Sequence, residues 1–141
     1  MPARILLIED NPANMTLMAY LLRAYGHTVL TAADGHAGIA LATSARPDLI
    51  VCDVHLPGID GIGIVRYLTL QPGLAAIPIV AVTALAMVGD RENLLQAGFD
   101  GYLAKPIEPT TFIAQLECFL PAELHASIDP TVRTHGDHPD C

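Results

Sequence analysis

Short apolar runs alternate along the chain with longer stretches whose apolar residues recur at helical intervals. The short runs are rich in Val, Ile and Leu and contain almost no polar residue, which is typical of strands buried on both faces of a sheet. Five such strands are expected, over residues 5–8, 29–31, 49–52, 78–82 and 102–104. A helical stretch follows each of them, over residues 15–25, 37–42, 62–68, 91–97 and 112–119. The pattern therefore predicts five strand–helix units.

Residues with restricted or permissive backbones mark the ends of several helices. Asn11-Pro12 opens the first helix and Gly26 closes it. Gly98 ends the fourth helix, and Pro109-Thr110 opens the fifth. The alternation of strand and helix predicts an α/β fold with a parallel sheet, right-handed crossovers and helices on both faces. A three-layer open sheet fits this pattern best.

Four of the predicted strands are followed by polar residues that can do chemistry. The first strand is followed by Glu9 and Asp10, and the third by Asp53. The fourth is followed by Thr83, and the fifth by Lys105, which is the only lysine in the chain. Ligands of open parallel sheets bind outside the carboxyl ends of the strands, where these residues fall. We therefore expect one polar pocket that contains three carboxylates, a hydroxyl and an ammonium group.

A pocket of this composition has a definite chemistry. Three carboxylates at one edge repel one another, so that a proton or a cation has to hold them together. Mg²⁺ takes one or two carboxylates, keeps several waters and bridges to phosphate, which suits a shallow site. An aspartate beside the metal can attack phosphorus to form an aspartyl phosphate, while the ammonium and hydroxyl groups receive phosphoryl oxygens. The sequence therefore predicts a Mg²⁺-dependent phosphoryl site.

Length and charge narrow the possible functions. The formal net charge of −8 over 141 residues argues against direct nucleic-acid binding, because phosphate contacts need clustered Lys and Arg. No apolar run reaches the roughly 18 residues of a membrane span, and a signal pattern is absent, so we expect a cytoplasmic protein without membrane insertion. We expect one domain over residues 1–120. The remaining residues, 121–141, lack periodicity and predict a flexible tail too short for an output domain.

Four separated motifs stand in the order found in a known family. They are Ile8-Glu-Asp-Asn, Asp53-Val-His-Leu-Pro-Gly-Ile-Asp-Gly, Val82-Thr-Ala and Lys105-Pro. Through these motifs, residues 4–120 closely resemble the receiver domain of two-component response regulators. The resemblance implies a flavodoxin-like (βα)5 sandwich with strand order 2-1-3-4-5. Within the family, the chain looks like the single-domain regulators of the DivK type and the receivers of hybrid kinases.

The resemblance also implies a metal and phosphoacceptor site. Asp53 is the expected phosphoacceptor. Asp10 and Asp53 are the expected Mg²⁺ ligands, and Glu9 is expected to support the ion through water. The backbone carbonyl of His55 completes the protein ligands, so its side chain is expected to be a bystander.

Two further roles follow from the same resemblance. Thr83 and Lys105 are expected to contact the phosphoryl group, and the Lys105–Pro106 peptide bond is expected to be cis. Tyr102 matches the aromatic switch position of the family. Phosphorylation is therefore expected to move Thr83 inward and to let Tyr102 fill the space that Thr83 leaves.

The implied role is that of a signalling protein and not of an enzyme, since the chain would catalyse only its own phosphorylation and dephosphorylation. A histidine kinase or a histidine phosphotransfer protein is the expected phosphodonor, and it is expected to dock on the first helix at Asn14, Met15 and Met18. A downstream protein would bind the surface of the fourth and fifth helices and the last strand. The resemblance implies a monomer or a weak dimer.

Three alternative functions remain open from the sequence. An aspartate-nucleophile phosphatase of the haloacid dehalogenase type needs a second acid two residues after the nucleophile, where this chain has His55. A flavodoxin-like electron carrier needs a phosphate-binding loop after the first strand, where Glu9 and Asp10 would repel the cofactor phosphate. A detached or hybrid-kinase-like receiver could serve as a phosphate sink or scaffold.

Several of the candidate residues also have a purely structural explanation. Asp53 could cap the helix that follows it, and Thr83 could cap the next one. Tyr102 could simply pack, and Lys105 could be an ordinary surface lysine. These explanations do not account for the grouping of all the polar residues at strand ends.

Overall fold

The computed structural model describes residues 3–84 and 88–125. Within these residues, five strands alternate with five α-helices, and a 3₁₀ turn, Ala122–Leu124, follows. The strands are Arg4–Ile8 (β1), Thr28–Ala32 (β2), Leu49–Asp53 (β3), Ile79–Thr83 (β4) and Gly101–Ala104 (β5). The helices are Pro12–Ala24 (α1), Gly35–Ala45 (α2), Gly61–Thr69 (α3), Val88–Ala97 (α4) and Phe112–Glu117 (α5). The predicted strand–helix units are confirmed.

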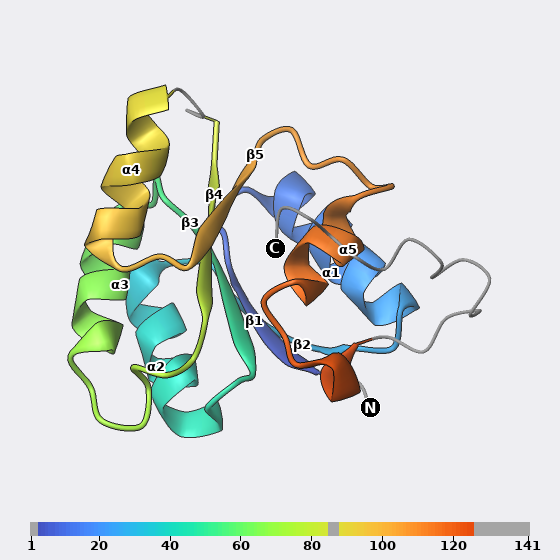
Figure 1. The fold of residues 1–141 in the computed structure, drawn as a ribbon, viewed down its shortest axis with the longest axis horizontal. Coiled ribbons are helices and arrows are strands. Elements are labelled where there is room, and N and C mark those ends of the chain that lie inside the picture. The colour runs from blue at the N-terminus through green and yellow to red at the C-terminus, as the bar shows by residue number, and fades with distance from the viewer. Residues whose placement is uncertain (1–2, 85–87, 126–141) are drawn as a thin grey trace.

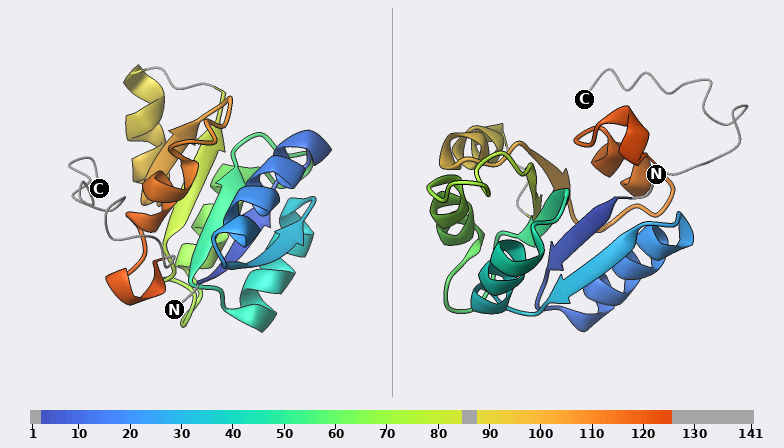
Figure 2. Two further views of the ribbon diagram at one scale, coloured as in Figure 1. Left: turned by 90° about the vertical axis from the view of Figure 1, so that its right-hand side faces the viewer. Right: turned by 90° about the horizontal axis from the view of Figure 1, so that it is seen from below.

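The five strands are parallel and lie in the order β2-β1-β3-β4-β5. Helices α1 and α5 cover one face of the sheet, and α2, α3 and α4 cover the other (Figures 1 and 2). The predicted flavodoxin-like, three-layer architecture and its strand order are therefore confirmed. The strand order reverses at β1, because the chain builds outward to β2 and then returns to β3 on the other side. Open sheets of this kind bind ligands at such a reversal.

Both faces of the sheet are buried, which explains the unbroken apolar runs. Successive side chains of a strand point to opposite faces. In β1, Leu6 and Ile8 join the apolar cluster under α2, α3 and α4, whereas Ile5 and Leu7 join the cluster under α1 and α5. Every residue of β3 and β4 is buried as well. The carboxyl ends of β1, β3 and β4 therefore emerge directly from the core.

Strands β3 and β4, like β2, extend one residue beyond their predicted carboxyl ends. Asp53 is the last residue of β3 and pairs with Val82. Thr83 is the last residue of β4 and pairs with Ala104. Since both residues belong to the sheet, their backbones are held by the ladder and not by a loop.

Local chemistry accounts for the helix boundaries. The side chain of Asn11 caps α1 by accepting a hydrogen bond from the backbone N–H of Asn14 at 3.1 Å, and Pro12 is the first helical residue. Gly26 and Gly98, which end the first and fourth helical segments, have φ of 89° and 123°, values that L side chains rarely adopt. Helix α5 ends at Glu117, two residues before its expected end.

Three smaller expectations can be compared with the structure. The Lys105–Pro106 bond is cis, as the family resemblance implies. Most of the expected flexible tail, residues 126–141, lies outside the described residues, so that expectation stays a prediction. None of the helices in the described part of the chain combines the length and the apolar character needed to cross a membrane.

Candidate functional site

The register of the sheet brings the predicted polar residues to one edge. Asp53 and Thr83 end the neighbouring strands β3 and β4. Glu9 directly follows β1, and its backbone N–H donates to the carbonyl oxygen of Ala32 at 3.0 Å. Lys105 directly follows β5, and its backbone N–H donates to the carbonyl oxygen of Thr83 at 2.8 Å. Backbone hydrogen bonds therefore fix the backbone position from which each of these side chains projects.

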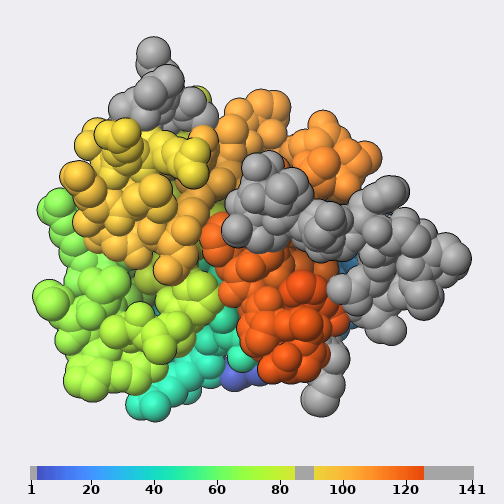
Figure 3. Space-filling view, viewed as in Figure 1, coloured from blue at the N-terminus to red at the C-terminus, as the bar shows by residue number. Residues whose placement is uncertain are grey.

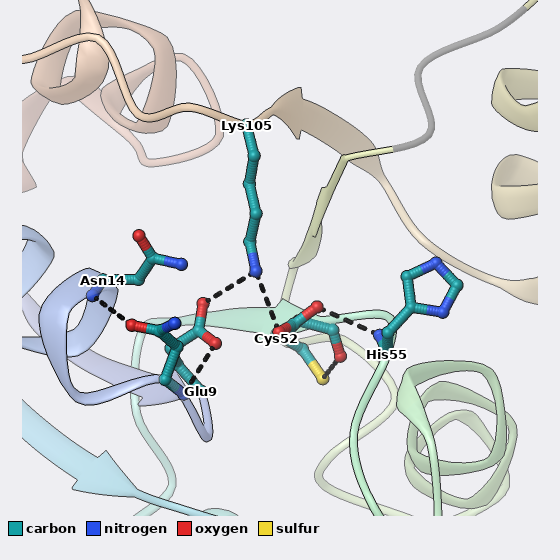
Figure 4. A network of polar contacts seen from close by, with 7 residues as sticks. Glu9, Asn14, Cys52, His55 and Lys105 are labelled. Carbon is teal, nitrogen blue, oxygen red and sulfur yellow. Dashed lines mark hydrogen bonds and ion pairs between the residues drawn. The ribbon is translucent and has the colours of Figure 1, made fainter.

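Lys105 joins two of the acids. Its Nζ lies 3.0 Å from Oδ2 of Asp53, to which it donates a hydrogen bond. The same Nζ lies 3.3 Å from Oε1 of Glu9, an ion-pair distance (Figure 4). The Lys105 side chain is 20% exposed, whereas those of Glu9 and Asp53 are 0% and 4% exposed. The ammonium group thus covers two buried carboxylates from the solvent side, which an ordinary surface lysine does not do.

Three carboxylates lie close enough to share a metal ion. Glu9, Asp10 and Asp53 each offer an oxygen, and these oxygens lie within 4.8 Å of one another. Glu9 and Asp53 are buried, and Asp10 is exposed. Buried Oε1 of Glu9 has no hydrogen-bond partner among the described residues, since its contact with Lys105 lacks hydrogen-bond geometry. An all-oxygen donor set with an orphaned buried oxygen and an exposed side fits a hard divalent cation such as Mg²⁺.

The electrostatics of the site follow from this crowding. Burial, followed by the neighbouring Asp53 carboxylate, raises the pKa of Glu9 to about 7. Partial burial lowers the pKa of Lys105, but Asp53 and Glu9 together raise it above its usual value. At neutral pH, Lys105 is therefore charged, while Glu9 is divided between its two protonation states. A bound cation would favour the ionised form of Glu9.

His55 approaches the site through its backbone. Its N–H donates to Oδ1 of Asp53 at 3.0 Å, which orients that carboxylate. Its imidazole is exposed and points away from the carboxylates (Figure 4). Both the bystander role of the His55 side chain and ligation by its carbonyl oxygen stay predictions.

Thr83 and Tyr102 occupy different surroundings. Thr83 is 2% exposed at the carboxyl end of β4. Tyr102 is half-buried in β5, opposite Ala81, and packs against the apolar cluster under α2, α3 and α4. The Tyr102 side chain therefore lies on the face of the sheet that α2, α3 and α4 cover, and not among the acids.

Asp53 does not cap α3. The cap of that helix is Asp60, whose side chain accepts a hydrogen bond from the backbone N–H of Gly63.

Three supporting residues were not identified from the sequence. The backbone N–H of Asn11 donates to Oε2 of Glu9 at 3.1 Å. Cys52 lies buried beside Asp53, and burial raises the pKa of its thiol. Gly61 allows α3 to approach β3, because a Cβ there would lie 2.7 Å from the carbonyl oxygen of Asp53. Asn11 and Gly61 left a signal in the sequence, as the last residues of the Ile8 and Asp53 motifs, but neither signal indicated these contacts.

Residues 5–117 match the family model described as the response regulator receiver domain. The polar-differentiation response regulator DivK of Brucella anthropi is 38% identical over 120 residues, which cover 85% of this chain and 98% of that protein. DivK of Brucella ovis is 36% identical over the same length and coverage.

Solved structures agree with these matches. The chemotaxis response regulator CheY4 of Vibrio cholerae has a TM-score of 0.81 at 29% identity and covers 85% of this chain and 100% of its own. The receiver domain of the sensor histidine kinase PA1611 of Pseudomonas aeruginosa has a TM-score of 0.77 at 40% identity, with coverages of 84% and 98%. That domain was solved with a magnesium ion coordinated in its active-site cleft.

Proposed function

This chain belongs to the response regulator receiver domain family, and from that membership we propose that Asp53 accepts a phosphoryl group from a phosphohistidine in a Mg²⁺-dependent reaction. The chain is homologous to DivK and CheY and acts in two-component signalling. Members of this family are mainly signalling proteins, and we propose that the chain catalyses only its own phosphorylation and dephosphorylation. We also propose a receiver domain over residues 1–120, a tail over 121–141 and a cytoplasmic location.

The single observation that carries the proposal is the position of Lys105 Nζ, between Oδ2 of Asp53 and Oε1 of Glu9. In the unmodified protein the Lys105 ammonium group pairs with the Asp53 carboxylate. It can pair with a phosphoryl oxygen instead once Asp53 is modified. When an oxygen of Asp53 bonds to phosphorus, the phosphorus–nitrogen bond of the donor breaks and its electron pair returns to the donor imidazole. Lys105 then transfers its hydrogen bond from Asp53 to a phosphoryl oxygen.

The acids hold the ion that this reaction needs. Asp10 and Asp53 would ligate Mg²⁺, the His55 carbonyl oxygen would complete the protein ligands, and Glu9 would act through water. Bound Mg²⁺ supplies positive charge that offsets the charge of the phosphoryl group. Oε1 of Glu9 supports this assignment, because it is buried without a hydrogen bond and has only the Lys105 ion pair to offset its charge.

We propose that Thr83 and Tyr102 transmit the modification. Phosphorylation adds roughly −1.5 to −2 charge beside Thr83, whose hydroxyl can donate to the new oxygens. Movement of Thr83 would let the Tyr102 ring turn inward and shift the population of a two-state surface. That surface is the face of α4, β5 and α5, parts of which lie next to one another in Figure 3. A downstream protein partner would bind there.

The phosphodonor would be a histidine kinase or a histidine phosphotransfer protein that docks on α1. The expected contact through Met18 is wrong, because Met18 is 1% exposed and packs in the core. Met15 is half-buried and lines a surface hollow of about 620 Å³ together with the exposed residues Tyr20 and Arg23. We therefore propose that the donor contacts Met15 and Tyr20.

Phosphorylation can be tested directly. The protein is incubated with Mg²⁺ and acetyl phosphate, and the mass change is measured for the wild type and for Asp53→Asn. We expect one added phosphoryl group in the wild type and none in the variant. Switching is followed in the same two proteins by the NMR chemical-shift changes on addition of beryllofluoride. A wild type that is neither modified nor shifted contradicts the proposed function.

We propose a stand-alone regulator like the DivK proteins, which this chain matches at 38% and 36% identity over 98% of their length. A phosphate sink or scaffold would take up phosphate at Asp53 without a change of the α4, β5 and α5 face. NMR shifts confined to the acidic site would support that second role.

A further inference from the structure

The loop between β3 and α3, residues 54–60, carries His55, and hydrogen bonds hold it chiefly at its ends. The N–H of Val54 donates to the carbonyl oxygen of Val82 at 3.1 Å, and the N–H of Gly61 donates to the carbonyl oxygen of Val54 at 2.9 Å. Near the start of the loop, the N–H of His55 donates to Asp53. The middle of the loop must therefore be placed largely by side-chain packing.

Ile59 is one of the side chains that packs there. It is half-buried and contacts the apolar cluster under α2, α3 and α4. A Cβ on Gly35, the first residue of α2, would collide with Cγ2 of Ile59 and would lie 2.7 Å from its carbonyl oxygen. A Cβ on Gly63, in the first turn of α3, would lie 2.9 Å from Cγ1 of Ile59. Ile59 thus occupies a seat formed by glycines of two helices, which we call the glycine seat (Gly35 and Gly63).

The glycines are needed for space and not for backbone conformation. Neither Gly35 nor Gly63 is among the residues with positive φ. Both stand in helices, where alanine is the better helix former. The close approach of Ile59 therefore explains why glycine occupies both positions, and it couples the loop to α2 and α3.

We propose that Ile59 is a positioning residue, which seats the loop between α2 and α3 and thereby holds the His55 backbone for divalent-cation binding at the acidic site. The proposal rests on the metal site assigned above, and it adds that the position of α2 sets the cation affinity. A backbone ligand cannot be adjusted by its own side chain, and the His55 ring is exposed. The position of the His55 backbone is set by the packing of the loop, in which Val54 and Leu56 on either side of it are buried in the same apolar cluster and Ile59 adds the contact with α2 and α3.

The test compares two isoleucines. Ile77 is also half-buried and packs against the same apolar cluster, but it precedes β4, at the opposite end of the sheet. Binding of Mg²⁺ alone is measured by calorimetry for the wild type, Ile59→Ala, Ile59→Val and Ile77→Ala. We expect Ile59→Ala to raise the dissociation constant about tenfold, in the range typical for groups that support metal ligands. Ile59→Val, which keeps both γ-carbons, and Ile77→Ala should remain close to the wild type.

Amide hydrogen exchange of the metal-free protein provides a second readout. The His55 amide should exchange faster in Ile59→Ala than in Ile77→Ala, because its bond to Asp53 depends on the loop position. Equal Mg²⁺ affinity and equal His55 exchange in the two alanine variants would overturn the proposal, and so would an equal loss of affinity in both.

Gly35→Ala tests the same contact by changing the glycine seat instead of Ile59. The added methyl group should weaken Mg²⁺ binding although alanine favours the helix, and its effect should not add to that of Ile59→Ala, since both act through one contact. Full additivity would contradict the proposal. Neither measurement uses a phosphodonor, so a wild type that binds Mg²⁺ but resists acetyl phosphate would refute the proposed function and leave this inference standing.

Discussion

Lys105 Nζ lies 3.0 Å from Oδ2 of Asp53, although Lys105 follows β5, Asp53 ends β3 and strand β4 lies between these strands. The long lysine side chain reaches across the end of β4, which is Thr83. The ammonium group, the hydroxyl and the carboxylate therefore come from three successive strands of the sheet. We expect a modification of Asp53 to change the environment of the Lys105 ammonium group, which donates to it, and of the Thr83 hydroxyl.

Replacing Lys105 with arginine should separate phosphorylation from switching. The positive charge is retained, but a planar guanidinium does not replace a compact ammonium group between two carboxylates. We expect Asp53 of Lys105→Arg to be modified by acetyl phosphate, while the NMR shifts of Tyr102 and α4 on beryllofluoride binding become smaller. Shifts as large as those of the wild type would contradict this role.

Glu9 should make the stability of the metal-free protein depend on pH. The pKa of Glu9 is raised to about 7 in the folded state, above its ordinary value of 4.5, so the folded state binds the proton more tightly than the unfolded state. The free energy of unfolding should therefore fall as pH rises from about 4.5 to 7, by on the order of 3 kcal/mol. Urea unfolding in EDTA measures this slope.

Glu9→Gln provides the control, since it cannot ionise and should remove most of the slope. Mg²⁺ should oppose the loss, because it binds the ionised carboxylates and stabilises the folded state. Stability that rises with pH across this window in the wild type, but not in Glu9→Gln, would contradict the assignment.

Two exposed tyrosines test the docking proposal. Tyr20 on α1 is 68% exposed and lies beside the hollow near Met15, whereas Tyr67 on α3 is 45% exposed. Tyr20→Ala should slow phosphotransfer from a phosphorylated histidine phosphotransfer protein about tenfold, as expected for loss of an aromatic contact of 1–2 kcal/mol. Its reaction with acetyl phosphate should not change. Tyr67→Ala should leave both rates unchanged, and equal effects of the two substitutions would argue against docking on α1.

A buried histidine should matter for stability and not for phosphorylation. Nδ1 of His27 accepts the N–H of Ala3 at 2.9 Å, so Nε2 carries the hydrogen and donates to Oε2 of Glu117 at 3.0 Å. His27→Ala removes both bonds and leaves a cavity, which should lower the free energy of unfolding by about 2–4 kcal/mol. His36→Ala, at an exposed position of α2, should change it little. His27 precedes β2, at the end of the sheet away from Asp53, so both variants should bind beryllofluoride. Chemical denaturation measures the stability of the two variants, and NMR measures their beryllofluoride binding.

The candidate site could be predicted where sequence neighbours carry the chemistry. Asp53 and Thr83 terminate apolar runs, and parallel strands necessarily bring their carboxyl ends to one edge. Met18 shows where this reasoning fails. Helical spacing identifies apolar residues, but it does not tell Met18, which is 1% exposed, from Met15, which is half-buried beside the surface hollow. That difference depends on which helices and strands pack against α1.

The sequence by itself determined the strand–helix alternation, the parallel sheet and the identity of the residues at its carboxyl edge, because these follow from local periodicity and chain direction. Only the tertiary structure decided how deeply Glu9 is buried, where the Lys105 ammonium group lies and which glycines make room for Ile59. It also decided the pairing of His27 with Glu117, which are 90 residues apart. Burial, charge coupling and close approach depend on residues that are distant in sequence, so they exist only once the layers have packed.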